Sequence, residues 1–465
     1  MQLYNTFSRQ LEEFTPISGK KVTLYTCGPT VYRDIHIGNF RTYLTTDILR
    51  RILKANEYEV TSVMNITDVG HFRLSKETNK VIDPVVEEAN KLGITPLELS
   101  KTYTEQFVKD ARKLNILEAD VLPKASDHIE EMIEVIKVLL DKGYAYEADG
   151  NVYFKVEKFK DYGKLSGNTL GKMDQLLEAV RVSVETDKKD TADFALWKRA
   201  DDRVMSWESP WGMGVPGWHI ECSVMSMKYL GVSLDIHAGG EDLVFPHHED
   251  EIAQSEALTG EKFVKTWVHT SFLSVEEEKM SRSKGNVFIL SDLINKGYTP
   301  LAFRYLTYQT HYRAKMNFTW EALDGAATAL NKIYDIAGKL PEGEGYADKY
   351  EVEFLHVLNQ DMNMPKALSI VWEMLRSDFP DQNKAAALRR MDEVLGLKIF
   401  ETAQKLTDIP ENVLELSYER DKLRKEGRYM LADQIRHKIE NMGFEVLDGK
   451  KVEGKKTETK ILRKL

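Results

Sequence analysis

The chain has 465 residues, of which 42% are hydrophobic and 30% are charged, and its formal net charge is -10 at pH 7. This length exceeds one compact core, so we expect two to four domains, and the acidic balance argues against indiscriminate DNA coating. No window approaches the roughly 18 to 20 apolar residues of a membrane span, and the amino terminus lacks the pattern of a secretion signal, so we expect a cytoplasmic protein.

The first 66 residues predict a βαβ unit. Residues 22–27 have the composition of a buried strand, apolar residues repeat at intervals of three and four from Phe40 to Leu53, and residues 60–66 are typical of a second strand. Such a unit strongly favours parallel pairing of its two strands.

The next part of the chain predicts helices, a hairpin and an insertion. We expect helices over residues 97–114 and 128–140, followed by two alternating runs around Asp149 and Gly150, a dipeptide that favours a hairpin turn. Residues 155–202 are charged and irregular, which indicates an insertion between two halves of a sheet.

Regular patterns resume after residue 217. The expected elements are a helix over 218–230, a strand over 234–240, a helix over 246–258 with Gly260 just past its end, and a strand over 266–275.

The last third of the sequence is mainly helical in its apolar spacing. Helical period covers most of residues 301–397, and Ile409 and Pro410 are typical of a linker. A charged helical pair over residues 413–442 precedes a basic tail, which is either a frayed solvated end or a nucleic-acid contact.

A first candidate site is HIGN, residues 36–39, which opens the first predicted helix directly after a strand and a turn. The first N–H groups of a helix lack partners and its dipole places partial positive charge there, so phosphate is a natural ligand. The imidazole of His36 adds a donor for charge that develops on a phosphoryl oxygen. Taken alone, these residues also suit a purely structural turn.

A second candidate is the polar loop EEEKMSRSKGN, residues 276–286. Lys279, Arg282 and Lys284 alternate with the hydroxyls of Ser281 and Ser283. Interleaved cations and hydroxyls suit a triphosphate, whose pyrophosphate leaves with extra negative charge. The alternative is a solvated charged loop.

A third candidate is a metal site. His247 and Glu251 are four apart on a predicted helix, so both side chains reach a common point. The chain has only two cysteines, Cys27 and Cys222, which is too few for a disulfide framework and leaves reduced thiols or metal ligands. Sulfur, imidazole and carboxylate together suit zinc, although a surface ion pair and two buried thiols explain the same residues.

Together, HIGN and KMSRS resemble the paired signatures of class I aminoacyl-tRNA synthetases. The segments CGPTVY, NITD, DFALWK, PGWHIECS and FPHHEDEIAQSEA resemble the cysteinyl-tRNA synthetase family in particular. The resemblance runs in the family's order from Tyr25 to the carboxyl end, where residues 416–449 are similar to that family's terminal helices.

The resemblance implies an α/β fold: a Rossmann-type parallel sheet catalytic domain with an insertion, followed by an all-α helical bundle and a small C-terminal domain. The implied segments are the two halves of the catalytic domain at 1–120 and 206–270, the connective insertion at 121–205, a linking fold with the KMSRS loop at 271–320, the helical bundle at 321–408 and an anticodon-binding domain at 409–465.

The resemblance also implies the reaction, which is ATP-dependent ligation of L-cysteine to tRNA(Cys) through a cysteinyl-adenylate. We expect a monomer with one Zn²⁺ per subunit and ATP with Mg²⁺ as a substrate. The implied zinc ligands are Cys27, Cys222, His247 and Glu251. Zinc would select cysteine over serine because it binds a thiolate better than a neutral alcohol.

The remaining site residues also follow from the resemblance. His36 and Asn39 are expected to face the ATP phosphates, and Lys279 and Arg282 to clamp the leaving pyrophosphate. The expected ATP-binding residues are Gly38, Gly240, Asp242, Lys279 and Ser281, of which Gly240 and Asp242 match the family's adenosine-binding turn. The expected cysteine-binding residues are Thr67, Trp218, Cys27 and His247.

Three positions depart from the family pattern. Asn39 stands where the first signature has a second histidine, and it keeps a hydrogen-bond donor. Arg282 stands where the second signature has a lysine, and its planar guanidinium keeps the charge without the geometry. After NITD, residues 69–73 read VGHFR in place of the usual acidic pair and lysine.

Two rival functions fit parts of this pattern. A ligase of the same ancestry that joins cysteine to an amino sugar would keep the zinc and both ATP motifs, but such relatives lack the anticodon tail. An inactive paralogue that binds RNA is the other rival, and it would not need His36, Lys279 and all four zinc-ligand candidates.

Overall fold

The computed structural model describes residues 1–70, 73–74, 81–168, 187–200, 205–280, 285–341, 345, 348–447, 451–452, 455–456 and 460–463. The chain forms two compact units. Unit 1 comprises Met1–Asp292, Thr307–Thr319 and Leu355–Leu368, and unit 2 comprises Leu293–Leu306, Trp320–Phe354 and Ser369–Leu465. Within the described ranges, no helix combines the length and hydropathy that a membrane span requires.

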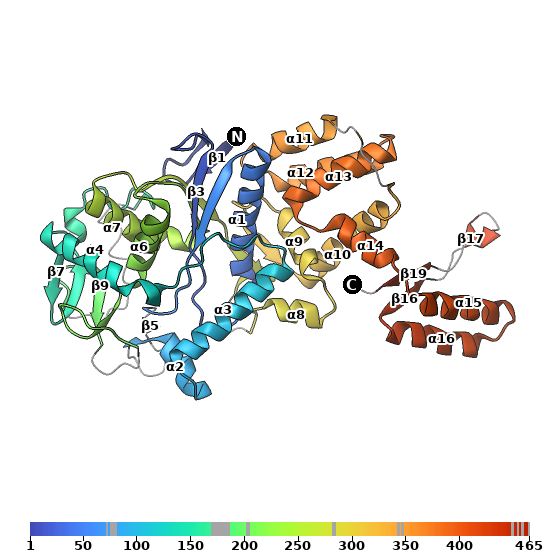
Figure 1. Cartoon of the computed structure of the whole chain (residues 1–465), viewed down its shortest axis with the longest axis horizontal. Coiled ribbons are helices and arrows are strands. Elements are labelled where there is room, and N and C mark those ends of the chain that lie inside the picture. Colours follow the sequence, from blue (N-terminus) through green and yellow to red (C-terminus); the bar gives the residue numbers. More distant parts are fainter. Residues whose placement is uncertain are drawn as a thin grey trace. The chain divides into compact units, whose positions relative to one another are not determined.

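Unit 1 is built on a parallel sheet. Its strands are β3 (Lys21–Thr26), β4 (Glu59–Met64), β11 (Leu234–Gly240) and β12 (Val264–Thr270), in the order β12-β11-β3-β4. Helix α1 (Ile37–Ala55) joins β3 to β4 and lies along the sheet (Figure 1), so the predicted βαβ unit is confirmed. The strands end at one edge of the sheet, where ligands of open α/β folds gather.

An antiparallel sheet separates the two halves of this parallel sheet in the sequence. Its strands are β7 (Ala145–Ala148), β8 (Asn151–Phe154), β9 (Phe194–Arg199) and β10 (Gly214–Pro216), in the order β10-β9-β8-β7. The hairpin turn has positive φ at Asp149 and Gly150, as its sequence predicted. The prediction that residues 155–202 are irregular was wrong for β9, a central strand of this sheet.

Among the described residues, five further α-helices lie entirely within unit 1. They are α2 (Pro84–Leu92), α3 (Pro96–Lys113), α4 (Ile129–Asp141), α6 (Trp218–Leu230) and α7 (Glu249–Thr259). Figure 1 shows α4 beside the antiparallel strands, and their apolar faces form one core with α6 and α7. A wider helical turn over Val244–His248 leads directly into α7, and within it only Phe245 has an extended backbone, with φ -140° and ψ 131°, so the helical conformation follows from Pro246, the predicted start. Gly260 ends the helix in the left-handed conformation, as predicted.

The strand predicted over residues 266–275 is broken in two. Strand β12 ends at Thr270, and β13 (Leu273–Val275) belongs to a separate sheet with β14 (Glu278–Lys279) and β15 (Met316–Phe318). Strand β15 lies in a region that was predicted to be helical. Ser271 and Phe272 therefore join two sheets of unit 1.

The remaining elements are mostly helices. They are α8 (Leu290–Asn295), α9 (Pro300–Tyr308), α10 (Trp320–Ala337), α11 (Asp348–Leu358), α12 (Met364–Arg376), α13 (Asp381–Leu395), α14 (Ile399–Thr407), α15 (Glu411–Lys425) and α16 (Tyr429–Asn441). The short strands are β1 (Gln2–Asn5), β2 (Gln10–Glu13), β5 (Arg73–Leu74), β6 (Val81–Ile82), β16 (Phe444–Leu447), β17 (Lys451–Val452), β18 (Lys455–Lys456) and β19 (Lys460–Arg463). The predicted fold class is confirmed, whereas the six segment boundaries stay predictions.

Candidate active site and metal centre

A cleft with a volume of about 320 Å³ lies at the carboxyl ends of β3 and β11. Residues 27–36 form one wall, and the start of α6 and the turn after β11 contribute to the others. Six of the predicted site residues line this one cleft: Cys27, His36, Asn39, Trp218, Gly240 and Asp242. The sheet topology therefore brings together residues that are more than 200 positions apart.

His36 is the N-cap of α1. Its Nδ1 accepts a hydrogen bond from the backbone N–H of Asn39 at 3.2 Å. A neutral imidazole with an accepting Nδ1 carries its proton on Nε2. The capping bond therefore assigns Nε2 of His36 as a hydrogen-bond donor.

The backbone at the start of α1 is less open than its sequence predicts. The N–H of Ile37 donates to the carbonyl of Phe288 at 2.9 Å, and the N–H of Asn39 is taken by His36. A Cβ on Gly38 would lie 2.4 Å from Cε of Met280, so glycine permits the close approach of the polar loop. Side chains, rather than these two N–H groups, must supply the donors here.

The structure describes little of the second predicted ATP motif, the KMSRS loop over residues 279–283. Lys279 lies in β14, where its backbone pairs with Ser274 of β13. Ser281 and Arg282 lie outside the described residues, as do His71 and Phe72 of the VGHFR departure. Their predicted roles stay predictions.

Thr67 belongs to a buried hydrogen-bond chain behind the cleft wall. The N–H of Gly28 donates to Oδ1 of Asn65 at 2.8 Å, and Nδ2 of Asn65 donates to Oγ1 of Thr67 at 3.0 Å. Oγ1 of Thr67 in turn donates to Oε2 of Glu221 at 2.9 Å. The chain links the ends of β3 and β4 to α6, and it fixes the orientation of the Thr67 hydroxyl.

Replacing Gly28 with alanine is expected to lower the free energy of unfolding by about 2–3 kcal/mol, a typical cost of overpacking. The new Cβ would lie 1.7 Å from the backbone oxygen of Asn65, and a backbone atom cannot rotate away. Thermal unfolding measures the loss. Gly325→Ala is the control, because a Cβ meets nothing within 4 Å there and alanine favours the helix interior. Equal melting temperatures for the Gly28→Ala variant and the parent chain would contradict the prediction.

Four predicted ligand residues meet next to the cleft. Cys27 follows β3, Cys222 lies in α6, His247 lies in the turn before α7, and Glu251 lies in the first turn of α7. Sγ of Cys27 is 3.8 Å from Sγ of Cys222 and 3.7 Å from Oε1 of Glu251, which is 3.1 Å from Nε2 of His247. One donor atom from each residue lies within 4.8 Å of all the others. This is a possible metal site.

The four groups are almost completely buried. Cys27 is 6% exposed and the other three are 1% exposed or less. Burial raises the pKa of the Cys27 thiol well above its usual range, and the neighbouring Cys222 adds to this rise. Burial also raises the pKa of Glu251 to about 7, which His247 partly opposes. A cation among these donors would favour their deprotonated forms.

Comparison with known proteins identifies the family. The family described as "tRNA synthetases class I (C) catalytic domain" matches residues 13–328. A protein of Caldicellulosiruptor saccharolyticus named cysteine--tRNA ligase is 40% identical over 97% of this chain and 99% of that protein. A protein of Burkholderia lata named cysteine--tRNA ligase 1 is 42% identical over 96% of this chain and 95% of that protein. The chain belongs to the cysteine--tRNA ligase family of class I synthetases.

Solved structures support the fold assignment. Mycobacterium tuberculosis methionyl-tRNA synthetase in complex with methionyl-adenylate matches with a TM-score of 0.56 at 16% identity. The match covers 83% of this chain and 92% of that chain. At this identity the likeness shows the class I fold alone.

Sequence reasoning missed a group of histidines around the candidate metal site of this member of the cysteine--tRNA ligase family. Nε2 of His237 lies 2.9 Å from Oε2 of Glu251, so it orients the carboxylate whose other oxygen faces the metal site. Nδ1 of His219 lies 2.8 Å from Nδ1 of His247, which leaves Nε2 of His247 facing Glu251. The signal was the adjacent histidines in FPHHE and the strand LDIHAGG.

His248 gives the centre a second possible ligand set. Its Nε2 is 3.3 Å from Sγ of Cys27, and its Nδ1 is 2.7 Å from Nε2 of His269. The donor atoms of Cys27, His237, His248 and Glu251 also lie within 4.8 Å of one another. The two sets share Cys27 and Glu251, so they are alternatives for one ion.

Proposed function

We propose that this chain uses ATP to join L-cysteine to tRNA(Cys) through a cysteinyl-adenylate. The observation that carries the proposal is the similarity to relatives named cysteine--tRNA ligase along nearly the whole chain. The cluster of two thiols, an imidazole and a carboxylate beside the cleft supports it, because it offers a means of selecting cysteine.

We further propose that Cys27, Cys222, His247 and Glu251 hold one zinc ion. A tetrahedral zinc with Zn–S distances of about 2.3 Å would separate two sulfur ligands by about 3.8 Å, and the two Sγ atoms are 3.8 Å apart. The same geometry would separate a nitrogen and an oxygen ligand by about 3.3 Å, close to the 3.1 Å between His247 and Glu251. The donor set and its spacing both fit zinc.

Selection of cysteine needs more than shape. A pocket that relies on shape separates near-isosteres such as cysteine and serine by only about 10- to 200-fold. When bound, zinc would supply a soft Lewis acid that accepts the substrate thiolate and accepts a neutral hydroxyl poorly. Trp218, whose ring stacks on that of His247 with 4.3 Å between the ring centroids, would cover the pocket. Thr67, behind the cleft wall, would contribute to the binding of cysteine.

In the first step the cysteine carboxylate attacks the α-phosphorus of ATP, and pyrophosphate leaves with Mg²⁺. His36 would donate from Nε2 to a phosphate oxygen, and the amide of Asn39 would donate beside it. Lys279 and Arg282 would neutralise the leaving pyrophosphate. Positioning and charge neutralisation carry such a reaction, since no side chain forms a covalent bond.

Other residues would bind the nucleotide. Gly240, the last residue of β11, and Asp242, in the turn that follows, line the cleft and would bind adenosine. Gly38 would let the loop that carries Ser281 lie close to ATP. In the second step a terminal ribose hydroxyl of the tRNA attacks the cysteinyl carbonyl, and AMP leaves. The monomeric state and the cytoplasmic location stay predictions.

Cysteine-dependent exchange of pyrophosphate into ATP tests the first step. We expect exchange with cysteine and not with serine from protein that contains zinc. No exchange from folded protein with a full metal complement would favour an inactive RNA-binding paralogue. Parallel assays with tRNA(Cys) and an amino sugar as acceptors test the second step. Transfer to the amino sugar alone would favour the ligase for a small thiol.

A further inference from the structure

Ser271 and Phe272 form the junction that leads into the β13–β14 hairpin, and this hairpin carries Lys279, the first residue of the predicted second ATP motif. The chain leaves the parallel sheet at Thr270, the end of β12, and enters β13 at Leu273. Strand β13 pairs with β14, so the backbone of Lys279 lies opposite Ser274. A shift of the junction would therefore move Lys279.

Arg41 of α1 binds this junction directly. Its Nη1 donates to the carbonyls of Ser271 and Phe272, both at 2.7 Å. Its Nη2 donates to the carbonyls of His311 and Ala314 at 3.3 and 2.6 Å, in the loop before β15. One guanidinium thus holds two loops that lead into paired strands of the same small sheet.

Glu241 holds the junction from another element. Its carboxylate accepts from Oγ of Ser271 at 2.7 Å and from the N–H of Phe272 at 3.0 Å. Glu241 follows Gly240 in the turn that lines the cleft. The peptide between Ser271 and Phe272 is therefore bonded through its carbonyl to the HIGN helix and through its N–H to the predicted adenosine-binding turn.

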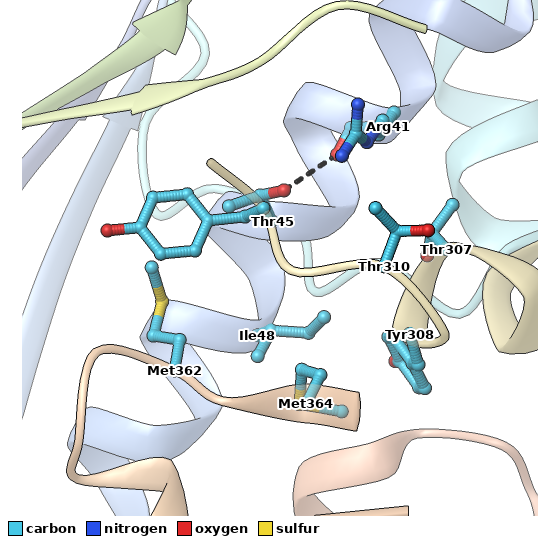
Figure 2. A pocket seen from close by; sticks show the side chains of 9 residues that line it. Arg41, Thr45, Ile48, Thr307, Tyr308, Thr310, Met362 and Met364 are labelled. Carbon is cyan, nitrogen blue, oxygen red and sulfur yellow. Dashed lines mark hydrogen bonds between the residues drawn. The ribbon is translucent and has the colours of Figure 1, made fainter. Parts of the chain in front are cut away.

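The setting of Arg41 indicates a specific demand for a guanidinium. Arg41 is 2% exposed, and Figure 2 shows it on α1 with Thr45 and Ile48, across a small pocket from Met362 and Met364. Burial lowers the pKa of Arg41 to about 10, and the Glu241 carboxylate opposes this effect, so the group stays charged at neutral pH. The two terminal nitrogens of a planar guanidinium can donate to four carbonyls on two loops, whereas a lysine ammonium has only three donors.

The far side of the polar loop also returns to α1. Ile289 forms a β-bridge with His36, and the carbonyl of Phe288 accepts from the N–H of Ile37. The loop between Lys279 and Phe288 is thus tied to the helix that carries His36 directly at its far end, and at its near end indirectly, through Ser271, Phe272 and the pairing of β13 with β14. Arg41 supplies the tie on the side of Lys279.

We infer that Arg41 is a positioning residue. Together with Glu241, which bonds the other side of the same peptide, it fixes the position of the β13–β14 hairpin, and with it Lys279, relative to His36. Its effect on catalysis rests on the proposed function, because only adenylate chemistry requires both motifs at one triphosphate. The geometric part of the inference is independent of that function. Whatever reaction the protein catalyses, the guanidinium of Arg41 holds the junction at Ser271 and Phe272 through its hydrogen bonds.

The test is Arg41→Lys, which keeps a cation and loses the fork. We expect faster hydrogen–deuterium exchange of the backbone amides in residues 273–280. We also expect pyrophosphate exchange with kcat lower by about 10-fold and a KM for pyrophosphate higher by about 5-fold, with the KM for cysteine within twofold. A purely structural loss would lower the active fraction and leave both KM values unchanged.

Arg50→Lys is the matched control. Arg50 lies on the same helix, is 6% exposed and pairs with Asp120 through two 2.9 Å bonds, away from the hairpin. We expect it to lower stability without faster amide exchange in residues 273–280. Ser271→Ala is the second variant if Arg41→Lys does not fold, since it removes one bond to Glu241 and should act in the same direction more weakly.

The outcomes separate the two proposals. Amide exchange in residues 273–280 that is unchanged by Arg41→Lys, or raised equally by Arg50→Lys, would overturn the inference. Absence of pyrophosphate exchange in the parent chain would count against the proposed function alone, and the amide exchange would still decide whether Arg41 holds the junction.

Discussion

Cys222→Ser is expected to lower the affinity for zinc by about 1,000-fold or more and to abolish most cysteine-dependent pyrophosphate exchange. The substitution turns a thiolate ligand into a neutral hydroxyl at a position that is 1% exposed, where no water can readily replace it. Loss of an outer partner of a metal ligand alone costs about 10- to 100-fold, so loss of a ligand should cost more. Elemental analysis and chelator competition measure the affinity.

Ser223→Ala is the control for Cys222→Ser. Ser223 is buried beside Cys222 on α6, and its hydroxyl donates to Gln254 at 2.6 Å. This variant should lose some stability and keep its zinc. Full metal occupancy and unchanged affinity in Cys222→Ser would show that the ion is held by Cys27, His237, His248 and Glu251, the alternative set.

Removal of residues 409–465 is expected to spare pyrophosphate exchange and to lower kcat/KM for tRNA charging by roughly 100-fold, about 2.8 kcal/mol. The cut is placed after α14 because α15, α16 and β16 share an apolar core of their own, formed by Val413, Ile439, Phe444 and Val446. Aminoacylation at two salt concentrations measures the effect, which should shrink as salt rises, because the full chain makes more phosphate contacts and therefore loses affinity for tRNA faster with salt than the truncated chain does.

The surface of the terminal helices suits a nucleic acid. Tyr418, Tyr429 and Met430 are 78%, 61% and 82% exposed, and aromatic faces of this kind can stack on unpaired bases. The last turn of α15 carries Lys422, Arg424 and Lys425. Tyr418→Ala in the full chain is the milder companion to the deletion. Equal charging with and without the segment would remove this argument for tRNA.

The sequence predicted those helices and turns that are determined by the spacing of apolar residues or by a turn dipeptide within a short segment. The spacing of apolar residues at three and four predicted α1, the regular pattern that resumes after residue 217 predicted α6, and Asp149 with Gly150 predicted the turn between β7 and β8. Strand β9 was missed because its burial does not alternate along its whole length: Phe194, Leu196 and Trp197 are all buried, in one apolar core with α4, α6 and α7. Strand β15 has three residues, too few for any period.

The site required more than local signals. Residue types suggested that Cys27, Cys222, His247 and Glu251 could share a metal, but only the pairing of β3 with β11 brings the segments together. The histidines at 219, 237 and 248 were missed because each is isolated from its partner in the sequence and acts through contacts between elements. The hydrogen bonds of Arg41 to the two loops were missed for the same reason. Their acceptors are backbone carbonyls, which no pattern of side chains reveals.

The order of the central sheet has a consequence for synthesis of the protein on the ribosome. Strand β3 is complete at Thr26, whereas its neighbour β11 begins at Leu234. At about 5–20 residues per second, translation leaves one edge of β3 without its partner for roughly 10–40 s. Over that interval the nascent chain exposes an unpaired edge of β3 and the thiol of Cys27. We therefore expect chaperones that bind emerging polypeptides to bind this segment during synthesis.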